Sequence, residues 1–159
     1  MFRKMRRINQ QLAEEENIRI LEEGTYGVLS LVGEGGYPYA VPLNYLYRSG
    51  KIIFHCAQNG HKTDALAADD RACFCVVDKS EVIPEQYATH YSSVIAFGRI
   101  KTLEGEEKRQ SALALAERFR PGHAAEAMGE INSYGEGLTV LEMTIEHMTG
   151  KQAKGLVGK

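Results

Sequence analysis

A run of short apolar segments, separated by glycine-containing turns, dominates the first half of the chain. The first three segments span residues 25–32, 39–47 and 51–57, and the turns "GEGGYP" and "RSGK" separate them. Apolar runs of this length bounded by glycine are typical of strands joined as hairpins. Regular alternation of strand and helix, which a parallel sheet requires, does not occur in the sequence. We therefore expect consecutive antiparallel strands.

The rest of the chain extends this pattern. The expected further strands are residues 72–78, 92–103 and 137–151, the expected helices are residues 9–24, 62–70 and 106–119, and residues 79–91 are expected to form a loop. The helix over 106–119 places Ala112, Leu115, Ala116 and Phe119 on one face. Six strands with helices around them predict a mainly β, six-stranded antiparallel barrel. With 159 residues and 43% hydrophobic content, the chain is expected to form one domain over residues 1–159.

Composition excludes several classes of protein. The longest apolar run, "ACFCVV" at residues 72–77, is too short to span a bilayer, and the basic start "MFRKMRR" leads into polar sequence. We therefore expect a cytoplasmic protein without a membrane partner. The net charge of −2 gives no reason to expect nucleic acid as a partner. Three cysteines, Cys56, Cys73 and Cys75, form no Cys-x-x-Cys pair and are expected to be free thiols.

The stretch "GHKTDAL", residues 60–66, directly follows a predicted strand and begins a predicted helix. A glycine followed by His61 and Lys62 at a helix start suits a bound phosphate, because free backbone N–H groups and the helix dipole already attract an anion there. A solvated loop with a capping glycine would have much the same sequence, so both interpretations stay open.

Two residues stand out within the predicted strands. In "KIIFHCA", Ile52, Phe54 and Cys56 share one face, which we expect to be core, and His55 lies on the other face because successive side chains alternate. A strand histidine is either a hydrogen-bonded structural residue or a functional one. The same alternation separates His55 from Cys56, so we expect no metal site there.

Pro42 is the second anomaly, because it lies in the middle of the predicted strand over residues 39–47. Proline has no N–H to give to a neighbouring strand, so this segment is expected to be an edge strand or to face a bound ring system with its own hydrogen-bonding edge.

Three segments together resemble a known superfamily: residues 22–78, "YSSVIAFGRI" and "IEHMTGK". They are similar to the flavin-binding split-barrel superfamily that contains pyridoxamine 5′-phosphate oxidase. Within it, "GYPYAVPLNY", the "FHCAQNGHK" segment and "VIPEQY" resemble the nitroimidazole-resistance branch. The resemblance implies a split barrel, a homodimer with FMN at the subunit interface, and reductive chemistry on a small-molecule electron acceptor such as a nitro compound.

The resemblance also implies roles for individual residues. The strand from Tyr39 to Asn44 would line the flavin ring, His55 and Cys56 would lie beside it, His61 and Lys62 would bind the phosphate, and Ser93 would contact the phosphate and ribityl end. The implied cofactor-binding residues are Tyr39, Val41, Pro42, Leu43, Asn44, His55, Cys56, His61, Lys62 and Ser93. The C-terminal substrate-binding segment of true pyridoxamine phosphate oxidases has no counterpart here, so vitamin B6 oxidation is not expected.

Two functions remain open from the sequence. One is an FMN-dependent oxidoreductase in which His55 is catalytic and delivers protons, since its ordinary pKa of about 6.5 suits proton transfer. The other is a carrier that holds flavin or haem without turnover, with His55 as an axial ligand of haem.

Overall fold

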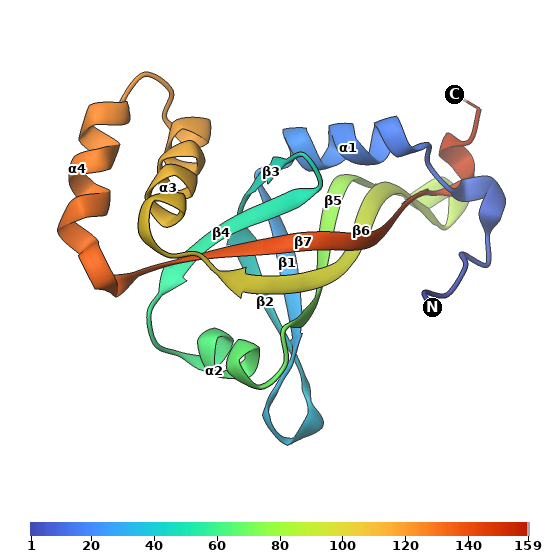
Figure 1. Ribbon diagram of the computed structural model, residues 1–159. Helices are drawn as coiled ribbons and strands as arrows, with labels where there is room; N and C mark the ends of the chain where they lie inside the picture. Colours follow the sequence, from blue (N-terminus) through green and yellow to red (C-terminus); the bar gives the residue numbers. More distant parts are fainter. Residues whose placement is uncertain (159) are drawn as a thin grey trace.

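The computed structural model describes residues 1–158 and contains one antiparallel sheet of seven strands. The strands lie in the order β2-β1-β5-β6-β7-β4-β3 (Figure 1). Their bounds are β1 (Tyr26–Val32), β2 (Pro38–Asn44), β3 (Leu46–Arg48), β4 (Lys51–Ala57), β5 (Arg71–Ile83), β6 (Ala88–Thr102) and β7 (Leu138–Gln152). The predicted fold class, a mainly β antiparallel barrel with attached helices, is confirmed. Within residues 1–158, no helix has the length and apolar character needed to cross a membrane.

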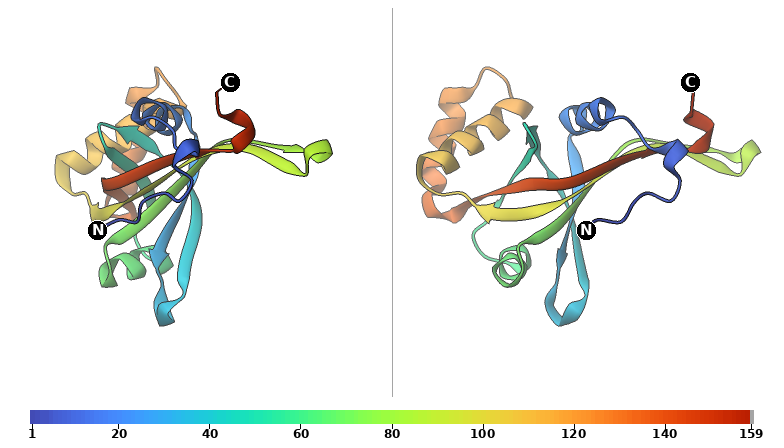
Figure 2. Two further views of the ribbon diagram at one scale, coloured as in Figure 1. Left: turned by 90° about the vertical axis from the view of Figure 1, so that its right-hand side faces the viewer. Right: turned by 45° about the vertical axis from the view of Figure 1, so that its right-hand side comes forward.

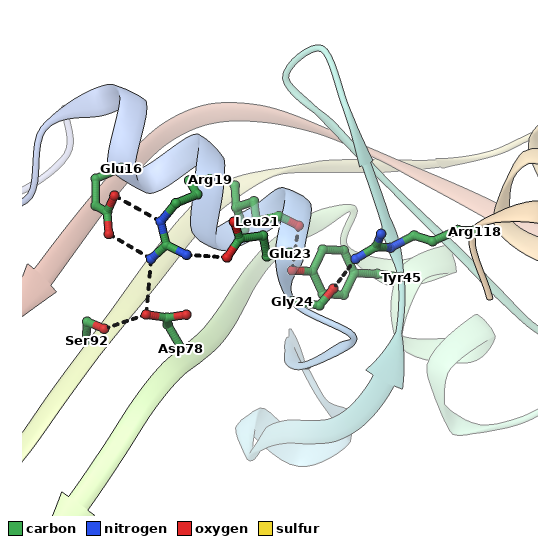
Figure 3. A network of polar contacts seen from close by, with 9 residues as sticks. All are labelled: Glu16, Arg19, Leu21, Glu23, Gly24, Tyr45, Asp78, Ser92 and Arg118. Carbon is green, nitrogen blue, oxygen red and sulfur yellow. Dashed lines mark hydrogen bonds and ion pairs between the residues drawn. The ribbon is translucent and has the colours of Figure 1, made fainter.

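The sheet has seven strands where the sequence predicted six, because the predicted strand over residues 39–47 breaks at Tyr45. Before the break the segment pairs with β1, and after it the segment pairs with β4. Tyr45 is fully buried, and its hydroxyl donates a hydrogen bond of 2.8 Å to the carbonyl of Leu21 (Figure 3). Since β2 and β3 are the two edges of the sheet, this one residue connects the edges and the sheet curls into a barrel that is split between them.

The main core fills the inside of the barrel. Ile52 and Phe54 of β4 are fully buried there, and Cys56 packs half-buried beside them, which confirms the predicted core face. The ring of Phe74 lies 5.0 Å from the rings of both Phe54 and Tyr45, in edge-to-face contacts. All seven strands contribute buried or partly buried apolar side chains to this core.

Helix α1 (Glu14–Glu23) covers one opening of the barrel (Figure 1). It starts later than the predicted helix over residues 9–24. Arg19 ties it to the sheet, since its guanidinium donates to Glu16 at 2.7 Å and to Asp78 of β5 at 3.2 Å (Figure 3). Asp78 also accepts a hydrogen bond of 3.0 Å from Ser92 of β6, so the helix is held to two neighbouring strands.

Gly24 ends α1 for a packing reason. Its backbone is extended, with φ −62° and ψ 140°, so it is not the left-handed cap that glycine usually provides. A Cβ at this position would overlap the Tyr45 hydroxyl. The Gly24 carbonyl also accepts a hydrogen bond of 2.8 Å from Arg118 (Figure 3). The end of α1 therefore contacts both Tyr45, which connects the two edge strands, and Arg118 of the C-terminal half of the chain.

Residues 79–91, predicted as a loop, instead form most of a long hairpin. β5 continues to Ile83, a 3-10 turn over Pro84–Gln86 follows, and β6 begins at Ala88. This two-stranded ribbon projects beyond the barrel (Figure 2). Its side chains are mostly exposed on both faces. Because no face of the ribbon is buried, its sequence lacks the alternation by which a strand is recognised.

Two helices cover the outer face of the sheet at the other end of the molecule, α3 (Gly105–Phe119) and α4 (Ala124–Tyr134) (Figure 1). A third, α2 (His61–Ala68), follows β4. Below α3 lies a second small core in which Ile53 is buried together with Leu103, Ala112 and Val140. The face of β4 that carries His55, opposite the main core, is therefore buried at Ile53.

Candidate functional site

The stretch that begins α2 has the backbone of an anion site. Gly60 is the N-cap and has φ 146°, in the region that favours glycine. No side chain caps this helix, and within the first turn Thr63 donates its hydroxyl to the Gly60 carbonyl at 2.8 Å. The first-turn N–H groups are therefore open to an anion at the positive end of the helix dipole.

His61 and Lys62 lie at this helix start in different surroundings. The His61 ring stacks on Tyr39 of β2, with 4.0 Å between the ring centroids. Lys62 is half-buried, and its positive charge acts on the pKa of both His55 and Cys56, so it lies close to the end of β4. The fold thus brings these five predicted residues into one region.

The segment from Tyr39 to Asn44 is an edge strand, which confirms one of the two interpretations of Pro42. Val41 and Leu43 point inward and pack against the main core, as Tyr39 does. Pro42 is exposed and points outward, as does Asn44. A ring system outside the barrel could therefore contact the side chains of Pro42 and Asn44, whereas Val41 and Leu43 could offer only their backbone.

His55 lies in the wall of a cavity of about 580 Å³ between the outer face of the sheet and the two helices α3 and α4. Most of the cavity wall is apolar, and Asn44, Glu130 and Tyr134 are its other polar residues. Asn44 is held in place by a hydrogen bond of 2.8 Å from its amide to the Thr25 carbonyl. The lining residues are Asn44, His55, Ala112, Leu115, Ala116, Phe119, Ala127, Glu130, Ile131, Tyr134 and Leu138.

One wall of this cavity was predictable from the sequence pattern, and the other was not predicted. The predicted apolar face of the helix over residues 106–119 supplies Ala112, Leu115, Ala116 and Phe119. The residues from α4 were not predicted to belong to any element. Ala127, Ile131 and Tyr134 recur at helical spacing between Gly122 and Gly135, and this spacing would have identified the helix.

The protein surroundings favour the neutral forms of His55 and Cys56. Desolvation by the surrounding protein, with a smaller contribution from the charge of Lys62, lowers the pKa of His55 below its ordinary value. Burial raises the pKa of the Cys56 thiol, and it also raises that of Cys73 and Cys75. All three are free thiols without the lowered pKa of a reactive cysteine. Residues 1–158 contain no cluster of three His, Cys, Asp or Glu side chains that could hold a metal.

Ser93 is far from these residues within one chain. It lies on the outer face of β6 and pairs with Lys151 near the C-terminal end of β7. Ala57, where β4 ends beside the α2 turn, pairs with Leu138 at the beginning of β7. Since these positions lie near opposite ends of the 15-residue strand β7, one chain does not bring Ser93 to the turn.

Comparison with known proteins assigns the chain to a family. The family described as pyridoxamine 5′-phosphate oxidase matches residues 13–152, which is most of the sequence. The chain belongs to this family. No curated protein sequence gives a significant match.

Solved structures share the family fold at low sequence identity. A conserved hypothetical protein from Mycobacterium tuberculosis matches with a TM-score of 0.81 and 16% identity, covering 96% of this chain and 92% of its own. An FAD and haem binding protein from Mycobacterium smegmatis matches with a TM-score of 0.76 and 21% identity, covering 94% and 76%. A candidate 5-nitroimidazole antibiotic resistance protein from Bacteroides thetaiotaomicron matches with a TM-score of 0.71 and 17% identity, covering 89% and 86%. At these identities the likeness establishes the split-barrel fold.

Proposed function

We propose that this protein is an FMN-binding oxidoreductase that reduces a small electron acceptor, such as a nitroaromatic or quinone-like compound. The observation that carries the proposal is the adjacency of two features in one chain. One is the apolar cavity with His55 in its wall, and the other is the cationic helix start at Lys62. Membership of the pyridoxamine 5′-phosphate oxidase family and the flavin-binding structural relatives support it.

The residues present fit a flavin. A flavin ring needs mainly apolar walls with a few polar groups at its edge, and the cavity offers Leu115, Phe119 and Ile131 as walls with Asn44 and His55 as polar groups. Its volume of about 580 Å³ lies in the range typical of small-molecule sites. The phosphate would bind at the start of α2. We favour FMN over FAD because this one cationic turn suits a single phosphate group.

A bound flavin would supply the electron chemistry, and the chain would supply binding, orientation and protons. Lys62 would hold the phosphate through its charged Nζ, and His61 would be fixed beside it by its stack on Tyr39. α3 and α4 would exclude water from the cavity. Because the pKa of His55 is lowered, its ring is neutral at pH 7, and the fraction carrying a transferable proton rises as the pH falls.

The absorption spectrum of the purified protein tests this function. We expect a flavin band near about 450 nm that bleaches with dithionite, followed by recovery when a nitroaromatic acceptor is added. A Soret band would instead support the haem-carrier alternative, which His55 in an apolar cavity also permits. Bleaching without recovery on any acceptor would support a flavin carrier and contradict the oxidoreductase.

We also propose that the protein is a homodimer, formed through the outer face of β1, β5 and β6. Val28, Cys75 and Ile95 lie side by side across these strands, and the next row is Ser30, Cys73 and Phe97. Val28, Ile95 and Phe97 are each more than a third exposed, which is unusual for neighbouring apolar residues on a sheet. The outward-facing apolar side chains on this face are Tyr26, Val28, Val77, Ile95 and Phe97.

A second copy of the chain would also explain how Ser93, which is remote from the α2 turn in its own chain, could contact a flavin phosphate. Ser93 lies on this same outer face, so dimerisation would place it against the partner instead of leaving it remote from the flavin phosphate. A symmetric dimer uses the same patch on both subunits, and a continuous apolar sheet face suits such self-association.

We predict that Ile95→Glu converts the dimer into a monomer and removes the bound flavin. The buried charge would have no partner at the interface, whereas it would be solvated in the free monomer. Sedimentation equilibrium of the parent should give twice the chain mass of 17.7 kDa, and the variant should give that mass itself. The control is Val157→Glu, because Val157 is 43% exposed, directly follows the turn Lys154–Leu156 and belongs to none of the three strands of the proposed interface. A parent protein that is a stable monomer with flavin bound would contradict the proposal.

A further inference from the structure

A second pocket is lined by residues close to both chain termini. The two termini lie at the same end of the sheet (Figure 1). The pocket has a volume of about 450 Å³, within the range of about 300 to 1,000 Å³ that is typical of small-molecule sites. Its walls come from the turn Ile8–Gln10 with the preceding Arg7, from the first residues of β6, from the end of β7, and from the turn Lys154–Leu156. The proposed flavin site uses none of these residues.

The lining of this pocket is basic. Arg7, Lys151 and Lys154 contribute three positive charges, and the ring of His90 also lines the pocket. The lining contains no carboxylate, and among residues 1–158 none of the three cations forms a salt bridge. Like charges that converge on a concave surface repel each other, so an anion bound between them would be favoured.

Backbone contacts hold together the segments that line this pocket. Gln11 and Lys151 form an isolated β-bridge, and the Ala153 N–H donates to the Tyr91 carbonyl at 2.8 Å. Lys151 donates to the Tyr91 hydroxyl, and its Nζ also lies 4.5 Å from the centre of that ring. Since the Tyr91 oxygen accepts this bond, its own O–H remains able to donate. The pocket is therefore assembled by the fold.

A buried polar group points to a ligand. Gln10 lines the pocket and is 8% exposed, and its side-chain Oε1 is buried without a hydrogen-bond partner. An unpaired buried amide oxygen is costly, so it calls for a donor. A shift of the Gln10 side chain toward the pocket would bring this oxygen to a ligand hydroxyl, and a half-turn of the amide would instead present its NH₂ to an anionic oxygen.

We propose that this pocket binds a small organic phosphate. Three cations, of which Lys151 is held by Tyr91, and the hydroxyl donors of Tyr91 and Thr89 match a doubly charged phosphate group better than a singly charged carboxylate. The volume leaves room for an organic part beyond the phosphate, whose hydroxyl would satisfy Gln10. The ligand is a small molecule and not a nucleic acid, because the basic groups line a pocket in a chain whose net charge is −2.

In the proposed dimer this pocket would be a neighbour of the partner's flavin phosphate, because Ser93 pairs with Lys151. The experiment must therefore separate the two sites. Calorimetric titrations with inorganic phosphate and with ribose 5-phosphate are carried out at constant ionic strength, on the protein as purified and on protein saturated with FMN. The variants are Lys154→Ala and, as the matched control, Lys4→Ala, which removes an exposed cation that does not line the pocket.

We expect one saturable site per chain in both preparations, with ribose 5-phosphate binding more tightly than phosphate. Lys154→Ala should weaken binding by at least about tenfold, since a charge-assisted contact is lost, and Lys4→Ala should leave it unchanged. The proposal is overturned by the absence of saturable binding or by equal binding to Lys154→Ala. It is also overturned if FMN displaces the bound phosphate, because the pocket would then be part of the flavin site. Equal affinity for ribose 5-phosphate and inorganic phosphate would overturn it as well.

Discussion

Replacing both His61 and Lys62 with alanine is expected to weaken FMN binding by at least about a hundredfold. Each charge-assisted contact to a phosphate contributes about 1.5 to 3 kcal/mol, so Lys62→Ala alone should weaken binding by about tenfold or more. Neither side chain belongs to either hydrophobic core, so the fold should remain. The dissociation constant is measured by quenching of flavin fluorescence.

The melting temperature of the flavin-free protein is the control for folding in these variants. Lys79→Ala is the matched control for charge, because Lys79 is an exposed lysine on the projecting ribbon. It should leave FMN affinity unchanged. Unchanged affinity in the double variant would show that the phosphate binds elsewhere.

The second large effect is expected at His55. His55→Ala should lower the turnover number by roughly a hundredfold, the lower range for a positioned general acid, while FMN affinity changes little. The reason is that His55 lies in the cavity wall, whereas the proposed phosphate contacts lie at the start of α2. Steady-state reduction of a nitroaromatic acceptor and flavin titration of the same samples measure both quantities.

The pH profile separates proton delivery from a structural role. The pKa of His55 is lowered by desolvation and by Lys62, so its protonated fraction increases only as the pH falls below the ordinary histidine pKa of about 6.5. The parent should therefore turn over faster towards acid pH. His55→Gln keeps a hydrogen-bond donor but cannot titrate, so it should lose this increase. If His55→Gln is as fast as the parent between about pH 5.5 and 8, His55 does not deliver the proton.

The fold was predictable where strands have one buried face. The alternation in "KIIFHCA" correctly separated Phe54 from His55, and Pro42 correctly indicated an edge strand. Residues 79–91 could not be recognised as strands, because both faces of the ribbon are exposed. The break at Tyr45 depends on pairing with two different strands, which no local pattern encodes.

The candidate site was predictable only in part. The helix start at Gly60 was predictable from local sequence, and the structure places Lys62 near His55. The roles of these residues toward a flavin stay predictions. The cavity itself depends on how α3 and α4 lie over the sheet, and the burial of Ile53 beneath α3 has the same tertiary origin. Ser93 stays apart from the turn within one chain, so its role depends on the proposed second copy.

Comparing FMN with riboflavin tests the central claim most directly, because riboflavin lacks the phosphate that the α2 turn is proposed to hold. Both flavins are titrated into flavin-free protein under the same conditions. We expect FMN to bind at least about a hundredfold more tightly than riboflavin, as the loss of two charge-assisted contacts implies. Equal affinity for the two flavins, or no binding of either, would contradict the assignment of the flavin to this site.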